Sequence, residues 1–247
     1  MGVGDSSNAA GYAAQMARRT RSSSGQSGAR YEIPRATTIV EGASVGFTGS
    51  FLLRVPYLYA AGDLSLLDQP AVAIVGSRGA SVEGQKRAAQ LARALVRDSV
   101  VVMSGLALGI DQAAHRATIE AGGKAIAVIG TPLDRAYPKE NADLQEMMWR
   151  SHLLLSPFPI GTRTFPSHFP ERNRVMARLS RATVIIEAGE TSGTLHQAVE
   201  CVAIQRPLFI SKSVIDDPKL KWPARFVSEP QTYVLETSSD VLDRVVR

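Results

Sequence analysis

Glycine, hydroxyl and arginine residues recur in three short segments whose chemistry suits phosphate groups. The first is Gly76-Ser77-Arg78, the second contains Gly105, and the third is Ser192-Gly193-Thr194. Glycine permits tight turns, backbone N–H groups at a helix start can face an anion, and a guanidinium matches the geometry of phosphate oxygens. We therefore expect these segments to bind phosphate. The alternative is that they are ordinary strand-to-helix turns whose hydroxyl groups only cap a helix.

A basic segment between Ile160 and Arg181 carries five arginines and one acid, hence a local charge of +4. Its candidate contacts to nucleic acid are Phe169, Arg172, Asn173 and Arg174. Arginine beside an aromatic ring suits a phosphate backbone whose bases stack on the ring. Lys139, in an earlier loop, is a further candidate phosphate contact. The alternative interpretation is a solvated charged face without a ligand.

No group of residues in the sequence forms a recognisable catalytic or metal site. Asp111 and His115 lie four residues apart and hence on one helix face, but a metal ion would need a third ligand. We expect an Asp111–His115 hydrogen bond with a structural role. Neither the GxGxxG fingerprint nor a Walker A motif is present. The sequence thus predicts a binding protein and not an enzyme, with no cofactor and no metal.

The phosphate-binding candidates follow short apolar segments that we predict to be strands. These are Ala71–Val75, Val100–Met103, Ala125–Ile129, Leu153–Leu155, Thr183–Ile186 and Pro207–Ile210, with Tyr57–Tyr59 as an additional candidate. Helical patterns lie between them. Strands that are apolar on both faces and alternate with helices indicate an α/β fold with a doubly wound, mostly parallel, Rossmann-like sheet. Ligands of such sheets bind beyond the carboxyl ends of the strands, near the topological switch point.

Composition excludes several classes of protein. The chain has 247 residues, of which 45% are hydrophobic, and a net charge of +5; these values exclude wholesale disorder, collagen and a coiled coil. No apolar run approaches the roughly 20 residues of a membrane helix, so we expect no membrane partner. The single cysteine, Cys201, excludes an intramolecular disulfide and a four-cysteine zinc site. It indicates a reducing compartment, for which we expect the cytoplasm.

We expect three regions along the chain. Residues 1–45 include a Ser/Gly/Arg-rich stretch that cannot bury enough apolar surface to fold, which predicts a flexible tail. An N-myristoylation site at Gly2 and a transit peptide are the alternatives to a plain tail. Residues 46–215 form the Rossmann-like domain, and residues 216–247 form a C-terminal extension that packs on it.

The ordered set of motifs resembles the DprA/Smf family of DNA-processing proteins. The motifs are Ile74-Val75-Gly76-Ser77-Arg78, Ser104-Gly105-Leu106-Ala107, Gly109-Ile110-Asp111 with His115, Tyr137-Pro138, Phe169-Pro170 with Arg172-Asn173-Arg174, and Glu187-Ala188 with Ser192-Gly193. Arg78 matches the family's pocket arginine after the first strand. Arg172 and Arg174 match the family's RNR motif. The match covers about residues 56–210.

The resemblance implies a Rossmann-like protein that binds single-stranded DNA, forms a homodimer and helps to load the RecA recombinase during transformation. Two segments depart from the family pattern, at Ser156-Pro157 and at Ser192–Ala198. The N-terminal segment is unlike the helical domain of some members. The roughly 35 residues after Ser211 are too few for a winged helix. We therefore expect a divergent single-domain member.

Two alternatives to DNA binding stay open. One is a sensor that binds a small nucleotide. The other is a LOG-type nucleoside monophosphate phosphoribohydrolase, which the chain resembles at Gly193-Thr194. The catalytic glutamate of that enzyme class aligns with Gln197, which cannot ionise, and Glu200 lies three residues further along. Cleavage of an N-glycosidic bond needs a carboxylate, so the sequence disfavours the hydrolase.

Overall fold

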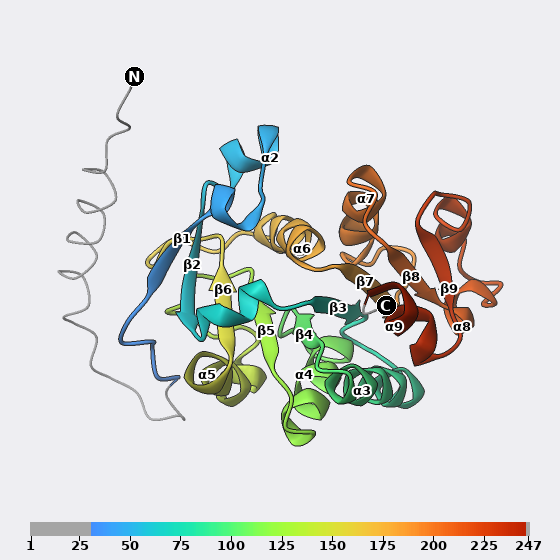
Figure 1. The fold of residues 1–247 in the computed structure, drawn as a ribbon, viewed down its shortest axis with the longest axis horizontal. Coiled ribbons are helices and arrows are strands. Elements are labelled where there is room, and N and C mark those ends of the chain that lie inside the picture. Colours follow the sequence, from blue (N-terminus) through green and yellow to red (C-terminus); the bar gives the residue numbers. More distant parts are fainter. Residues whose placement is uncertain (1–30, 246–247) are drawn as a thin grey trace. The chain divides into compact units, whose positions relative to one another are not determined.

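Residues 31–245 are the part of the chain that the computed structural model describes, and they build a nine-stranded sheet with helices on both faces (Figure 1). The strands are β1 (Thr38–Glu41), β2 (Tyr57–Gly62), β3 (Ala71–Gly76), β4 (Val101–Ser104), β5 (Ala125–Val128), β6 (Leu153–Ser156), β7 (Ala182–Glu187), β8 (Leu208–Ser211) and β9 (Thr232–Leu235). Their order across the sheet is β1-β2-β6-β5-β4-β3-β7-β8-β9. The pairs β1–β2 and β2–β6 are antiparallel, and all pairs from β6 to β9 are parallel.

This strand order places the topological switch point at the middle of the sheet. From β3 the chain continues through β4, β5 and β6 on one side, and it then returns to fill β7, β8 and β9 on the other. β3 and β7 are parallel neighbours whose last residues, Gly76 and Glu187, lie opposite each other. The turns that follow these two strands therefore leave the sheet from adjacent points, which is where ligands of open α/β sheets bind.

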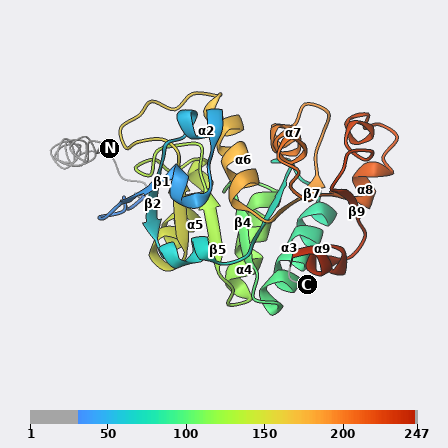
Figure 2. The ribbon, with the colours of Figure 1, turned by 45° about the horizontal axis from the view of Figure 1, so that its top comes forward.

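Helices cover both faces of the sheet (Figures 1 and 2). They are α2 (Gly49–Arg54), α3 (Val82–Arg97), α4 (Ile110–Glu120), α5 (Ala142–Ser151), α6 (His168–Leu179), α7 (Leu195–Ala203), α8 (Lys212–Ile215) and α9 (Ser238–Val245), with short 3-10 turns at Gly42–Val45, Leu64–Asp68, Lys139–Asn141 and Trp222–Arg225. In Figure 1, α2, α6 and α7 lie above the sheet, and α3, α4, α5 and α9 lie below it. None of the described helices is both long and apolar enough to cross a bilayer.

β3 shows why both faces need this cover. Its residues from Ala71 to Val75 are all buried. Side chains alternate between the two faces of a strand, so Val75 packs in the core beneath α6 and α7, whereas Ile74 packs in the core beneath α3 and α4. A strand that is apolar at every position is typical of a parallel sheet between two helical layers.

The predicted α/β fold with a mostly parallel, doubly wound sheet is confirmed. A strand is present at each of the six predicted segments and at the additional candidate near Tyr57. β1 and β9 were not predicted. Their side chains are exposed or only half-buried, so these edge strands lack the continuous apolar pattern that identified the others.

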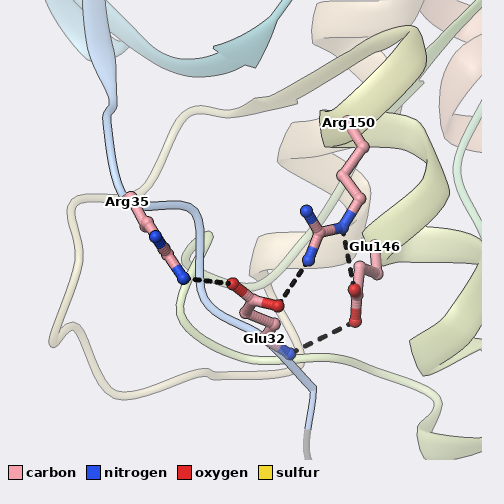
Figure 3. Close-up of polar contacts among 4 residues, drawn as sticks. All are labelled: Glu32, Arg35, Glu146 and Arg150. Carbon is pink, nitrogen blue, oxygen red and sulfur yellow. Dashed lines mark hydrogen bonds and ion pairs between the residues drawn. The ribbon is translucent and has the colours of Figure 1, made fainter.

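The segment before β1 is attached to α5, so the described fold begins ahead of residue 46. The Tyr31 hydroxyl donates to the carbonyl of Leu133 at 2.9 Å. The Glu32 carboxylate pairs with Arg35 and Arg150, and Arg150 Nε also donates to Glu146 at 2.8 Å (Figure 3). The predicted tail of residues 1–45 is therefore too long at its C-terminal end, and its first thirty residues lie outside the described residues.

The C-terminal segment continues both the sheet and one helical layer. β9 pairs in parallel with β8. Val241 and Val245 of α9 are buried in the same core as Leu91 of α3. Residues 216–245 thus contribute a strand and a helix to the fold.

Candidate functional site

The turns after β3 and β7 contact each other at the switch point. Ser77 donates its N–H to the carbonyl of Glu187 at 2.7 Å, and Thr194 Oγ1 donates to the carbonyl of Gly76 at 3.3 Å. A Cβ on Gly76 would lie 2.6 Å from the Glu187 carbonyl oxygen and 2.6 Å from Ile110 Cγ1. Only glycine fits this position, so Gly76 allows the two turns and α4 to approach closely.

Among the backbone donors that the sequence suggested, two N–H groups in the described turns are available to a ligand. The N–H of Ser192 donates to the Gly189 carbonyl and that of Thr194 donates to Ser192 Oγ at 3.2 Å. The N–H groups of Arg78 and Gly193, by contrast, have no hydrogen-bond partner among the described residues. Both residues are exposed. Of the backbone donors that the sequence suggested, these two can therefore bind an anion without first breaking a bond.

The N-terminus of α3 is already occupied by a carboxylate of the chain itself. Glu187 accepts the Ser81 N–H at 3.0 Å and the Ser81 hydroxyl at 2.6 Å, while Ser81 Oγ caps Gly84 at 2.9 Å. A Cβ on Gly84 would lie 2.3 Å from Glu187 Oε2. The expectation that this helix start faces a bound anion is therefore wrong, because Glu187 provides the negative charge that a helix N-terminus favours.

Arg172 lies in the interior, where it joins three segments. It is 5% exposed, and its guanidinium donates to the carbonyls of Gly105 and Val128, the latter at 2.7 Å. Burial lowers the pKa of Arg172 to about 10, and the nearby Asp111 opposes this shift. Burial likewise raises the pKa of Asp111. The predicted phosphate contact by Arg172 is thus replaced by a structural role.

Gly105 and Asp111 belong to the same buried arrangement. A Cβ on Gly105 would lie 2.0 Å from Nη1 of Arg172, so a side chain at this position would displace the buried guanidinium. Asp111 accepts the N–H groups of Gly105 at 3.1 Å and Ala107 at 3.4 Å. The predicted Asp111–His115 hydrogen bond is absent from the described residues, where neither ring nitrogen of His115 has a hydrogen-bond partner. Gly105 therefore supports the site from within and offers no N–H to a phosphate.

The other residues of the predicted RNR motif are also engaged. Asn173 donates from Nδ2 to the Gly193 carbonyl at 3.0 Å and so holds the turn after β7 against α6. Arg174 pairs with Glu171 at 2.9 Å and lies 3.8 Å from Glu200. Glu200 also binds Arg178 at 2.5 Å. Carboxylates from α6 and α7 therefore neutralise this part of the basic segment.

The last arginine of that segment lies at the opposite edge of the sheet. The N–H of Arg181 donates to the carbonyl of Ala71, the first residue of β3. Of the basic segment, Arg181 thus lies at the amino edge and Arg178 is paired with Glu200. Arg172 reaches the carboxyl ends of β4 and β5, but it is buried there and bound to the chain.

An arginine and two aromatic rings form the surface of the site. The Arg78 guanidinium lies 5.4 Å from the ring centroid of Phe169, and that ring lies 5.4 Å from the ring of Tyr137, which is 46% exposed. Phe169 packs on Gly130, where a Cβ would lie 2.7 Å from the ring. We call Arg78, Tyr137, Phe169 and Gly193 the switch-point surface. Sequence reasoning missed Tyr137 as a contact, although its place after the strand β5 was a usable signal.

Further cations and rings border this surface. Lys139 is exposed in the turn that follows Tyr137. Arg135 donates to Thr164 Oγ1 at 3.3 Å, which joins the loops after β5 and β6. Phe165 is 47% exposed, and the Arg163 guanidinium lies 5.5 Å from its ring centroid. Alternating guanidinium groups and rings at one edge suit a chain of phosphates with stacking bases.

The arrangement gives little support to hydrolysis. Gln197 is fully buried and donates to Thr183 Oγ1 at 2.9 Å. Glu200 is neutralised by Arg178, and Glu190 accepts the N–H of Trp222 at 3.1 Å. The described residues also contain no group of three or more His, Cys, Asp or Glu side chains suited to a metal ion. The carboxylates near the site, those of Glu187, Glu190 and Glu200, thus accept hydrogen bonds from donors of the chain itself.

Comparison with known proteins gives consistent matches. A family model described as DNA recombination-mediator protein A matches residues 52–245. DNA processing protein DprA of Streptococcus pneumoniae is 43% identical over 160 residues, which are 64% of this chain and 56% of that protein. The X-ray structure of the S. pneumoniae DprA superposes with a TM-score of 0.75 at 33% identity, covering 86% of this chain and 76% of that one.

A second solved structure shares the fold. It is DNA processing protein A from Helicobacter pylori, described for its single-stranded DNA binding mode, with a TM-score of 0.71 at 24% identity over 84% of this chain and 94% of that one. At this identity the likeness concerns the fold alone. The chain spans about half the length of the curated relatives it matches.

Proposed function

The chain belongs to the family of DNA recombination-mediator protein A, and on that premise we propose that it binds single-stranded DNA and acts as a recombination mediator. The observation that carries the proposal is the Arg78 guanidinium over the ring of Phe169, beside the unpaired N–H groups of Arg78 and Gly193. A cation, two N–H donors and an aromatic face are the groups that single strands need from a protein.

Each residue of the switch-point surface has a distinct role in this proposal. Arg78 neutralises a phosphate, and its own N–H and that of Gly193 donate to phosphate oxygens. Tyr137 and Phe169 stack bases, and Lys139 attracts the backbone that leaves the site. Asn173, Gly105 and Arg172 are positioning residues, because they hold the turns and α6 together without facing the ligand. Ser192 and Thr194 fix the turn after β7.

The larger role follows from the family. We propose that the protein works as a homodimer in the cytoplasm and transfers the bound strand to RecA during DNA uptake. The support is the family match over residues 52–245 and the 43% identity to a DNA processing protein. We assign it no reaction of its own, since the carboxylates near the site are already bound to donors of the chain.

A gel-shift comparison of matched single-stranded and duplex oligonucleotides tests this function. The protein is expected to prefer the single strand, and Arg78→Ala is expected to weaken that binding by about tenfold or more, the effect of losing one charge-assisted contact. Arg181→Ala is the matched control, since it removes an equal charge at the opposite edge of the sheet. Equal losses in both variants, or no loss in either, would show that the switch-point surface is not the DNA site.

A further inference from the structure

A groove beside α3 carries arginines that the switch-point surface does not use. It has a volume of about 350 Å³ and lies between α3, the ends of β7 to β9 and the first residues of α9. Both ribbon views show α9 alongside α3 (Figures 1 and 2). From α3 the groove is lined by Arg87, Arg93 and Arg97, and from the other side by the hydroxyl residues Ser211, Thr237 and Ser238.

Two of the three arginines form no ion pair with any described residue. Arg93 pairs with Glu120 at 3.2 Å. Arg87 and Arg97 have no ion-pair or hydrogen-bond partner among the residues that the structure describes. Nε of Arg87 is moreover buried without a partner. A buried charged donor without an acceptor is costly, so an acceptor in the groove would remove an existing penalty.

The placement of these arginines on the helix directs them to one groove. Positions 87, 90, 94 and 97 follow the spacing of three and four residues that defines one helix face. Arg87 and Arg97 are therefore on the same face, about 15 Å apart along the axis at 1.5 Å per residue. A single acidic side chain, Glu236, lines the groove against the three arginines. The groove thus has a positive excess and room for more than one anionic group.

The start of α9 contributes hydroxyl groups to the groove, but the backbone N–H groups just before this helix are already bound. Asp240 already accepts the N–H groups of Glu236 at 2.9 Å and Thr237 at 2.8 Å. The arginines must therefore supply most of the attraction for an anion. Guanidinium forks together with hydroxyl donors match the oxygens of phosphate.

We propose that the α3–α9 groove is a second anion site that binds phosphate groups through Arg87 and Arg97. The phosphates belong either to a nucleic-acid strand or to a small phosphate compound, since both present the same oxygens. The proposal does not rest on DNA binding at the switch-point surface. The N-terminus of α3, at the end of the helix nearest the switch point, is already bound by the carboxylate of Glu187.

Titration of the full chain by NMR tests the groove directly. The Nε–Hε signal of Arg87, assigned by its loss in Arg87→Gln, is followed in an Arg78→Ala background with inorganic pyrophosphate and, separately, with a thymidine oligonucleotide without terminal phosphates. A saturable shift with either probe supports the site, and the tighter probe identifies the source of the phosphate. No shift with either probe overturns the proposal, whatever happens to DNA binding in Arg78→Ala.

Matched variants distinguish binding in the groove from a general effect of the positive charge of α3. Arg97→Gln is expected to weaken binding of the effective probe by about tenfold, the effect of one charge-assisted hydrogen bond. Lys86→Gln removes an equal charge from the same helix at an exposed position paired with Glu83, and it is expected to leave the titration within about twofold. An equal loss in Lys86→Gln and Arg97→Gln would overturn a specific site, since it would reflect only the net charge of α3.

Discussion

Arg78 and Arg172 have the same side chain but different surroundings. Arg78 is exposed over an aromatic ring, while Arg172 is buried and donates to two carbonyl groups. Sequence reasoning predicted a phosphate contact for both. The difference could not be predicted, because the acceptors of Arg172 at Gly105 and Val128 are 67 and 44 residues away in the chain, and only the assembled fold brings them together.

Removal of the buried guanidinium should destabilise the fold. Arg172→Gln leaves the buried carbonyls of Gly105 and Val128 without their donor and removes the positive charge that acts on the buried Asp111, which we expect to cost about 3 kcal/mol. Urea unfolding measures this change in the free energy of unfolding. Arg181→Gln, at an exposed position whose guanidinium donates to the Val245 carbonyl, should lose no more than about 1 kcal/mol. Equal stability of the two variants would contradict the structural role of Arg172.

His115 should make stability depend on pH. Burial lowers its pKa in the folded chain to about 3 from an ordinary value of 6.5. The unfolded chain therefore takes up a proton that the folded chain refuses, so His115 contributes to stability above the ordinary pKa and this contribution is lost as the pH falls. Between about pH 6 and pH 4 the free energy of unfolding should fall by about 1.4 kcal/mol per unit from this group.

The variant His115→Gln isolates that contribution. Its free energy of unfolding, measured by urea unfolding across the same pH range, should depend less steeply on pH than that of the parent chain. The difference in slope should be about 1.4 kcal/mol per pH unit, which corresponds to one proton. An unchanged slope would mean that His115 is protonated in the folded chain.

At the scale of elements, the turn after β7 both stabilises α3 and sets the charge near the site. Glu187→Gln should lower the free energy of unfolding by about 1 kcal/mol, the usual cost of a weakened helix N-cap. It should also tighten single-strand binding several-fold, because a negative charge next to the switch-point surface is removed. Both are measurable on one preparation, by urea unfolding and by gel shift.

Asp98→Asn is the control for that prediction. It removes the same charge at the other end of α3, in an exposed position, and should leave DNA binding unchanged. Weaker binding in Glu187→Gln would contradict the assigned position of the phosphate.

α6 explains why the basic segment was misinterpreted. The helix has 12 residues, His168–Leu179, and at 1.5 Å per residue it runs about 18 Å back across the sheet. Its first residues therefore lie at the carboxyl edge, and Arg181 lies at the amino edge. Helix length could have been predicted from the sequence, but the acidic partners Glu171 and Glu200 could not have been paired with specific arginines in advance.

At the scale of the molecule, the fold was more predictable than the site. Buried strands such as β3 are apolar at every position, so their alternation with helices was sufficient to predict an α/β fold with a mostly parallel sheet. The site depends on which polar groups remain free after folding. The N–H groups of Ser77 and Gly105 are taken up by other parts of the chain, whereas that of Arg78 is not. Sequence patterns identify candidate donors, but the fold decides their availability.

The salt dependence of single-strand binding is the most direct test of the central claim that Arg78 contacts a phosphate at the switch point. For single strands, the slope of log affinity against log salt is about −0.7 per neutralised phosphate. The Arg78→Ala variant should therefore show a slope about 0.7 shallower than the parent chain, while Arg181→Ala should keep the parent slope. A slope in Arg78→Ala equal to that of the parent chain would contradict the claim.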